Sequence, residues 1–343
     1  MASPRTHQSR PRAVRAAVSA AAVATAALTV AASTTTAAHA DAVSSAGVVN
    51  PNGVVNSNDV VNSNGVVNSN SVKQASAKTA AAAISGWTQV THYLESTLSA
   101  GEGVATVYPP GGSGSVIYRG VASIPIADAV AGWTHIGDPD SVDGYVFDAF
   151  QSGDSSPTTK MFRVTTPSGS AYEYTHALVP GEQYNNSFDA ISPDTRWMVA
   201  GAWGTMSHLQ VYPTPILNPQ TGASGGALAL SGYVQLDRQV ADVQGCDFVT
   251  AAKLVCASDD NSRTLFPEQK PLLEVDLSHA LAGGDVTGHV VDLGAIPQTD
   301  SICSGTFESE GVDYDPATGI LRVEIIQPSI CEVATTVYEY KAG

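Results

Sequence analysis

Short apolar segments separated by polar turns recur along this chain, and residues 185–212 show the pattern most clearly. There an apolar run, Phe188–Ile191, leads into the turn Ser-Pro-Asp-Thr, in which proline fixes φ and the polar side chains can bond the local backbone. Residues 196–201 run back, and a third segment around Val211 alternates apolar and polar positions. The pattern predicts three antiparallel strands in a meander, the unit of an all-β fold.

The same unit recurs at spacings of roughly 45–65 residues, which is within the range of propeller blades. Further copies lie at residues 145–165, 254–277 and 312–340, and a weaker first copy lies at 104–118. The sequence has no long helical pattern. Five visible units without helices predict a β-propeller, because radial repeats leave only short, protected sheet edges. A β-sandwich is the alternative, but it would not need the recurring turn-and-return units.

The first 40 residues have the pattern of an export signal. Four arginines without an acidic residue precede an Ala/Val-rich stretch at residues 16–32, and Ala38-His39-Ala40 is a small-x-small cleavage site. The alternative is a membrane anchor, but the stretch is alanine-rich and weakly hydrophobic for a span of ~20 residues. The sequence offers no second candidate span, so we expect a secreted, extracellular protein that is not bound to a membrane.

Residues 41–83 contain four copies of a hexapeptide close to Gly-Val-Val-Asn-Ser-Asn. Four copies with little bulk beyond valine are too few for a stable β-helix. We therefore predict that this segment is a low-complexity linker or pro-region. Residues 84–343 remain for a single propeller domain, which is a reasonable length for that fold.

The acidic composition narrows the range of partners. The chain has 16 basic and 32 acidic residues, a net charge of −16. Removing residues 1–40 takes away four arginines and no acid, which leaves 12 basic residues and a net charge of −20. Such a surface argues against nucleic acid, which proteins bind through Lys and Arg on phosphates, and against anionic membranes. It is compatible with cationic or metal-containing partners, and equally with a simple solvated surface.

Four cysteines in an exported chain indicate two disulfides, for which three connectivities exist. Their spacing favours Cys246–Cys256, which closes a small loop inside one unit, and Cys303–Cys331, which ties the strands of the last unit. A metal site or a catalytic thiol is the alternative, but no Cys-x-x-Cys pair appears in the sequence.

Candidate chemistry is concentrated between His135 and Asp143. Asp138, Asp140 and Asp143 could offer oxygen atoms to a calcium ion, which takes about six to eight such ligands. No glutamate follows at the spacing that a calcium loop needs, so the spacing favours a turn with aspartate caps. His135 could line a central channel. No nucleophile–base pair and no zinc-ligand spacing stands out, so the sequence predicts no catalytic residue.

Three segments together resemble a group of exported streptomycete β-propellers: residues 133–151, 185–204 and 310–326, in a chain with two predicted disulfides. The resemblance covers residues 84–343 and implies seven blades, whereas five units are visible in the sequence. It also implies a protein without a protease site of its own. Such a protein binds neutral zinc metalloproteases of the thermolysin type, induces their autolysis and serves as a glutamine-donor substrate of transglutaminase.

A glutamine donor must lie on backbone that is flexible enough to enter the transglutaminase cleft. Local composition ranks Gln74 and Gln298 first, and Gln151 and Gln220 follow on similar loop grounds.

Two other classes of function stay open on the sequence alone. A lyase or hydrolase at the central channel would need His135, Asp138 and His208 to cluster at its mouth together with an acid. A carbohydrate-binding lectin would need Trp133 and Trp203 to be exposed.

Overall fold

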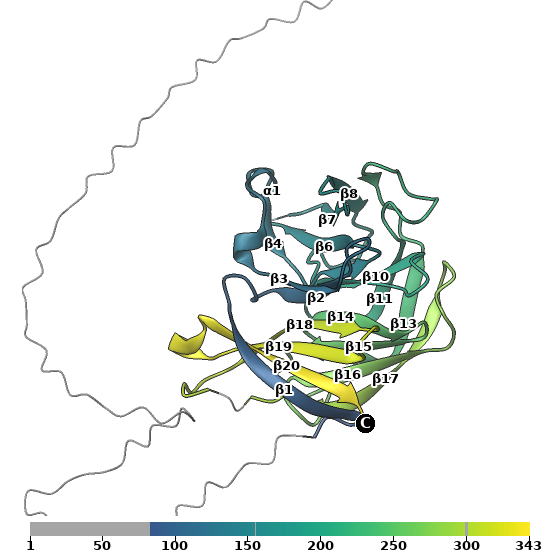
Figure 1. The fold of residues 1–343 in the computed structure, drawn as a ribbon. Coiled ribbons are helices and arrows are strands. Elements are labelled where there is room, and N and C mark those ends of the chain that lie inside the picture. Colours follow the sequence, from purple (N-terminus) through teal and green to yellow (C-terminus); the bar gives the residue numbers. More distant parts are fainter. Residues whose placement is uncertain (1–82, 155, 299–300) are drawn as a thin grey trace, which may run out of the picture. The chain divides into compact units, whose positions relative to one another are not determined.

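The computed structural model describes residues 83–154, 156–298 and 301–343 (Figure 1). Within them the chain is almost entirely β-structure, with one short helix, α1 (Ile126–Val130), and two 3₁₀ turns, η1 (Val121–Ser123) and η2 (Ser329–Cys331). No helix in this part of the chain is long and apolar enough to cross a membrane. The predicted signal peptide and the hexapeptide repeats lie outside the described residues. The all-β prediction is confirmed.

Short turns connect the strands, and most strands pair with a neighbour in sequence. In chain order the strands are β1 (Trp87–Ser96), β2 (Gly103–Val107), β3 (Ser115–Arg119), β4 (Trp133–Ile136), β5 (Asp140–Val142), β6 (Tyr145–Ser152), β7 (Thr159–Thr165), β8 (Ala171–Ala177), β9 (Phe188–Ile191), β10 (Trp197–Gly201), β11 (Met206–Pro213), β12 (Gly226–Ala227), β13 (Gly232–Val240), β14 (Val243–Thr250), β15 (Lys253–Ser258), β16 (Pro271–Leu277), β17 (Val286–Ala295), β18 (Glu308–Asp315), β19 (Ile320–Ile326) and β20 (Ala334–Ala342).

The strands form five mainly antiparallel units (Figure 1). The first unit is the hairpin β2-β3, and the second contains β4 and β5 beside β6, β7 and β8. The third is β9-β10-β11-β13, the fourth is β14-β15-β16-β17, and the fifth is β18-β19-β20-β1. A parallel pairing of β13 with β17 joins the third and fourth units into one eight-stranded sheet.

The innermost strand of each unit lies against the innermost strand of the next unit. β2 contacts β5, β5 contacts β9, β9 contacts β14, β14 contacts β18, and β18 contacts β2. This closed ring of five inner strands is the arrangement of a five-bladed β-propeller. The fold class predicted from the sequence is therefore confirmed. The described residues form the five blades visible in the sequence, not the seven that the resemblance implies.

The fifth blade is completed by the first described strand. β1 pairs antiparallel with β20, from Trp87 opposite Ala342 to Ser96 opposite Ala334. Trp87 also packs edge-to-face on Tyr314 of β18, with ring centroids 6.1 Å apart. β1 is an outer strand with few buried side chains, so its apolar pattern is too weak to predict it from sequence.

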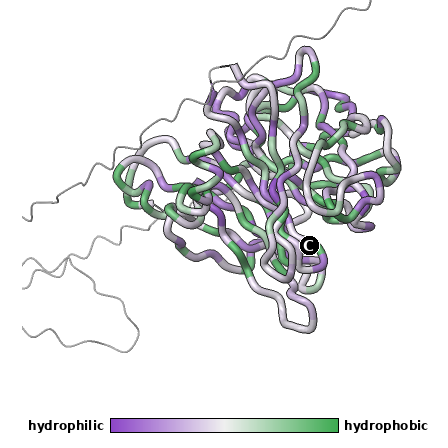
Figure 2. The backbone as a smooth tube through the Cα atoms, turned by 90° about the horizontal axis from the view of Figure 1, so that it is seen from above, coloured by the Kyte–Doolittle hydropathy of each residue, from purple (hydrophilic) through white to green (hydrophobic). Residues whose placement is uncertain are grey.

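The hydrophobic core lies mainly between the blades. Successive side chains of a strand point to opposite faces of its sheet, so each blade can present an apolar face to each neighbour. The largest cluster joins the third and fourth blades and includes Phe188, Val199 and Leu254. A second joins the fourth and fifth blades around Leu272 and Val323. Figure 2 shows short hydrophobic stretches spread around the domain rather than gathered in one block. Burial of each large side chain contributes about 1.5–3 kcal/mol, so packing between blades stabilises the ring.

Both predicted disulfides are present. Cys246 and Cys256 are directly opposite each other on β14 and β15, and their bond closes a sequence separation of 10. Cys303 is joined to Cys331 at the end of η2, over a sequence separation of 28. The second bond ties the connection before β18 to the connection before β20.

Candidate functional site

One aspartate, Asp138, fills the middle of the propeller axis. It lies between β4 and β5 and is fully buried. The backbone amide of Val104 in β2 donates a hydrogen bond to Oδ1, and the amide of Val312 in β18 donates one to Oδ2, both at 3.0 Å. Asp138 therefore links the first, second and fifth blades to one another at the axis.

Three glycines let the inner strands approach this carboxylate. A Cβ atom at Gly103, Gly245 or Gly311 would lie 2.3, 2.2 or 2.4 Å, respectively, from an oxygen of Asp138. No side chain fits at these positions. The axis is therefore closed at its middle, and a separate pocket lies at each end of it.

The pocket at the carboxyl ends of the inner strands has a volume of about 770 Å³. Among the aspartates that line it, Asp140, Asp247 and Asp313 lie on inner strands. Each carboxylate accepts a hydrogen bond from a backbone amide of the next blade, at 2.5, 2.5 and 2.7 Å respectively. These aspartates therefore connect successive blades, and their oxygens are already engaged in the fold.

The three aspartates considered for calcium do not converge on one point. The carboxylates of Asp138 and Asp140 bind backbone amides, and Asp143 lies in an exposed turn with a φ of 52°. In the described ranges, no group of three or more His, Cys, Asp or Glu side chains could hold a metal ion. The turn interpretation therefore holds for Asp143, and the calcium alternative finds no support in the geometry.

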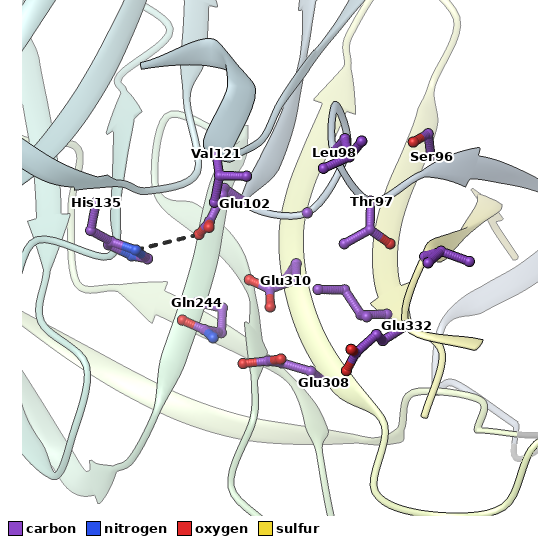
Figure 3. A pocket seen from close by; sticks show the side chains of 13 residues that line it. Ser96, Thr97, Leu98, Glu102, Val121, His135, Gln244, Glu308, Glu310 and Glu332 are labelled. Carbon is purple, nitrogen blue, oxygen red and sulfur yellow. Dashed lines mark ion pairs between the residues drawn. The ribbon is translucent and has the colours of Figure 1, made fainter. Parts of the chain in front are cut away.

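A second pocket, of about 470 Å³, lies at the amino ends of the inner strands (Figure 3). We call it the acidic pocket because Glu102, Glu308 and Glu310 line it, together with Gln244 of β14 and His135 of β4. His135 Nδ1 lies 3.6 Å from Glu102 Oε2. No lysine or arginine is among the described residues that line this pocket.

Burial changes the charge of the acidic pocket. It raises the pKa of Glu102 to about 8, with the charge of Glu308 as a second cause, and it lowers the pKa of His135. Burial also raises the pKa of Glu310 well above its ordinary value, and the charges of Glu308 and Glu102 add to this effect. At neutral pH the pocket therefore keeps protons on carboxyl groups that would be ionised in water.

The acidic pocket does not assemble the enzyme site considered from the sequence. Thr97 supplies a hydroxyl, but its Oγ1 is hydrogen-bonded to Thr335 Oγ1 at 3.0 Å and not to a base. His135 lines the pocket, Asp138 is buried in the middle of the axis, and His208 lines a different pocket. The cluster of His135, Asp138 and His208 that a lyase or hydrolase would need is therefore not formed.

Exposed aliphatic side chains surround the mouth of the acidic pocket. Leu98, Val121 and Val333 are 67%, 58% and 72% exposed, and all three line the pocket. We call them the apolar rim. They come from the β1–β2, β3–β4 and β19–β20 connections, where Ile126 and Ile330 add further exposed apolar surface. Gathered apolar surface of this kind marks interaction sites more often than an isolated exposed leucine does.

The candidate glutamines lie in different settings. Gln220 is exposed in the turn after β11, and Gln298 is half-buried in the irregular segment after β17. Gln151 was expected in a loop but belongs to β6, where it pairs with His135, because β6 runs two residues further than the apolar pattern indicates. Gln74 lies outside the described residues.

The two tryptophans expected to be exposed in a lectin differ from each other. Trp203 is 49% exposed, whereas Trp133 is half-buried against a small cluster that contains Phe150. The exposed pair that a lectin would need is therefore not present.

The acidic pocket was not predicted from the sequence, although the sequence contains a signal for it. Glu102-Gly-Val and Glu310-Gly-Val are the same tripeptide, and Gln244-Gly-Cys is a near copy. In each, the glycine packs on Asp138 and the preceding residue lines the pocket. Repeated Glu/Gln-Gly pairs at the starts of inner strands could therefore have placed these side chains around one axis.

No family model and no curated protein matches the chain. Among solved structures it is similar to a luciferin-regenerating enzyme (13% identity, TM-score 0.37, 66% of each chain covered). It is also similar to a gluconolactonase from Xanthomonas campestris (11% identity, TM-score 0.32, covering 61% of this chain and 59% of that one). The matches thus span less than two thirds of those chains. The strand order and the closed ring of inner strands define the propeller.

Proposed function

We propose that the protein is a secreted, non-catalytic binding protein that docks neutral zinc metalloproteases of the thermolysin type and induces their autolysis. The observation that supports this proposal is the apolar rim around the acidic pocket, presented by loops of a rigid five-bladed ring. The exported propellers that the chain's motifs resemble include the Dispase autolysis-inducing protein, which suggests the class of partner. The predicted signal sequence and the two disulfides agree with an extracellular site of action.

Docking can promote autolysis without any catalytic group on this protein. A partner that binds an opened conformer of the protease more tightly than the closed one shifts the population toward the opened form. Opened molecules expose segments that other protease molecules cut. The loss of protease must then depend on the catalytic centre of the protease.

The test mixes the purified exported chain with an active thermolysin-type protease and, separately, with a catalytically inactive variant of it. The inactive protease is expected to bind and to remain intact, and the active one to be cut at its own apolar-residue specificity, as followed by electrophoresis. Equal degradation of the inactive protease would show that this protein is itself a protease. Absence of binding to both at micromolar concentration would reject the docking proposal, because a standard-sized interface should be detectable there.

Matched variants test where docking occurs. Leu98→Ser combined with Val333→Ser should weaken binding about tenfold or more, because it removes apolar area from the rim. Val90→Ser, also at an exposed aliphatic residue of β1 but near the other end of the strand, should leave binding unchanged. Equal effects of the rim and control variants would place the interface elsewhere.

We also propose that the protein is a glutamine-donor substrate of transglutaminase. We rank Gln220 above Gln151, because Gln220 is exposed in a turn whereas Gln151 lies in β6. Labelling with a fluorescent amine and peptide mapping should recover Gln220 and Gln298, together with Gln74 from the segment outside the described residues. Label confined to strand glutamines such as Gln151 would contradict this proposal.

A further inference from the structure

We propose that the acidic pocket receives one lysine or arginine side chain of the docked protein. This inference rests on the proposed function and adds its chemistry: the docking surface recognises a basic residue flanked by apolar ones. The apolar rim would contact the flanking residues, and the carboxyl groups inside the pocket would bind the cation.

Glu310 is the residue that points to a ligand. It is only 4% exposed, and it lines the pocket together with Glu102 and Glu308 (Figure 3). Among the described residues, no group donates a hydrogen bond to its carboxyl group or forms an ion pair with it. Unlike those of Glu324, its carboxyl oxygens are not fully enclosed, and in the pocket they can pair with a cation, which offsets the cost of burial.

The surroundings of Glu310 increase its attraction for a cation. After burial, the charges of four further carboxyl groups raise its pKa most: Glu308, Glu102, Asp259 and Glu324. Lys270, whose charge acts on Glu308, is already ion-paired with Asp259. The protein's own basic residues therefore leave the pocket free for a cation from a partner.

The shape and lining favour an organic cation over a metal ion. No cluster of His, Cys, Asp or Glu among the described residues could hold a metal. Leu98, Val121 and Val333 at the mouth offer apolar contact to the methylene stem of a lysine or arginine, whose charged head can then reach the glutamates. A volume of about 470 Å³ leaves room for such a side chain and some water.

Binding of a cation should release protons, because it favours the ionised glutamates. The groups that face Glu310 or line its pocket are Glu102, His135, Glu308, Glu332, Glu324 and Asp259, with Lys270 behind Asp259. At low pH the glutamates are protonated and His135 takes up positive charge, and both effects oppose a cation. Affinity should therefore rise with pH up to the pKa of Glu102, which is about 8.

The test uses the exported chain and two small probes. One is Nα-acetyl-lysine N-methylamide, which keeps the charged side-chain ammonium, and the other is its uncharged counterpart Nα-acetyl-norleucine N-methylamide. The lysine probe should shift the NMR signals of the His135 ring in a saturable manner, and its affinity should increase at least about tenfold between pH 6 and pH 8.5. The norleucine probe should leave the His135 signals unchanged. Equal shifts from both probes, or an affinity independent of pH, would overturn the proposal.

Variants test whether the lysine probe binds at the acidic pocket or elsewhere on the acidic surface. Glu310→Gln should lower affinity for the lysine probe at least about fivefold, whereas Glu268→Gln, at an exposed glutamate far from the pocket in sequence, should not. Should Glu310→Gln fail to unfold cooperatively, Glu308→Gln takes its place with the same expectation. Full affinity in the pocket variant would reject the assignment.

The two proposals fail in different ways. If inactive metalloprotease binds but the lysine probe does not, docking stands and the basic-residue pocket is wrong. If the probe binds but the protease does not, the pocket stands and the protease is the wrong partner.

Discussion

Asp138 shows how one side chain can change the use of a whole propeller axis. Its two oxygens bind amides of two blades, and three glycines pack directly on it. A channel that could pass through the ring is thereby divided into two pockets of different character. In the acidic pocket, none of the described residues forms an ion pair with Glu310. The aspartates of the opposite pocket, in contrast, accept hydrogen bonds from backbone amides of neighbouring blades.

Gly245→Ala tests this packing. The new Cβ would lie 2.2 Å from Asp138 Oδ2, so we expect the free energy of unfolding to fall by about 1–3 kcal/mol, as for overpacked cores. Urea denaturation measures the change.

The same substitution in an Asp138→Ala background identifies the contact. The penalty should shrink because the oxygen is gone, although the Cβ would still lie 2.8 Å from the amide nitrogen of Val312. An unchanged penalty would mean that Asp138 is not what excludes a side chain at Gly245.

At the scale of elements, the connections between strands form the apolar rim, and a disulfide restrains some of these connections. Cys303–Cys331 joins two connections near the acidic pocket, since η2 ends at Cys331 and is followed by Val333 of the apolar rim. The bond restrains a segment that has few buried side chains of its own.

Replacing both cysteines of this pair by serine should reduce the free energy of unfolding by about 3–4 kcal/mol, because the closed loop of 28 residues regains its entropy in the unfolded chain. Urea denaturation under oxidising conditions checks the value. Under the proposed function, metalloprotease binding should weaken as well, since the rim loses part of its order. Binding at full strength would show that Val333 does not need the restraint.

The sequence predicts strands that are short apolar runs bounded by turns. Phe188–Ile191 was predicted at the bounds that the structure shows. β1 could not be predicted in this way, because an outer strand needs few apolar residues. The acidic pocket was not predicted either, because Glu102 and Glu310 come together only when the ring closes. Local spacing in the sequence contains no information about ring closure.

At the scale of the whole molecule, buried carboxyl groups connect stability to pH. Burial raises the pKa of Glu102 from 4.5 to about 8 and that of Asp140 from 3.8 to about 7, although amides of Ile191 and Ser141 bind the latter. A group whose pKa is raised by folding contributes its full stabilisation when the pH lies below its pKa in the unfolded chain. This contribution is lost as the pH rises to its pKa in the folded protein.

Glu182 acts in the opposite direction. Burial opposes its ionisation, but the hydrogen bond to His176 and the charge of Lys160 lower its pKa from 4.5 to about 2. Its contribution is present above pH 4.5 and is lost as pH falls toward 2.

We therefore expect the melting temperature to be highest near pH 5, to fall steadily toward pH 8.5, and to fall again below pH 4. Differential scanning calorimetry across this range measures the profile. Glu102→Gln should flatten the decline toward pH 8, because the side chain no longer titrates. A melting temperature that rises from pH 5 to pH 8.5 would contradict the assignment of raised pKa values.

The pairing of β1 with β20 imposes an order on biosynthesis. Thr97, just after β1, bonds to Thr335, which is 238 residues later in the chain. During synthesis β1 therefore waits without its partner until nearly the entire domain has emerged, and the fifth blade is the last to be completed. Contacts of such long sequence separation fold slowly and leave strand edges open to wrong pairings. Six of the ten residues of β1 are polar, which is then an advantage, because polar side chains let a strand remain unpaired during this interval with less tendency to aggregate.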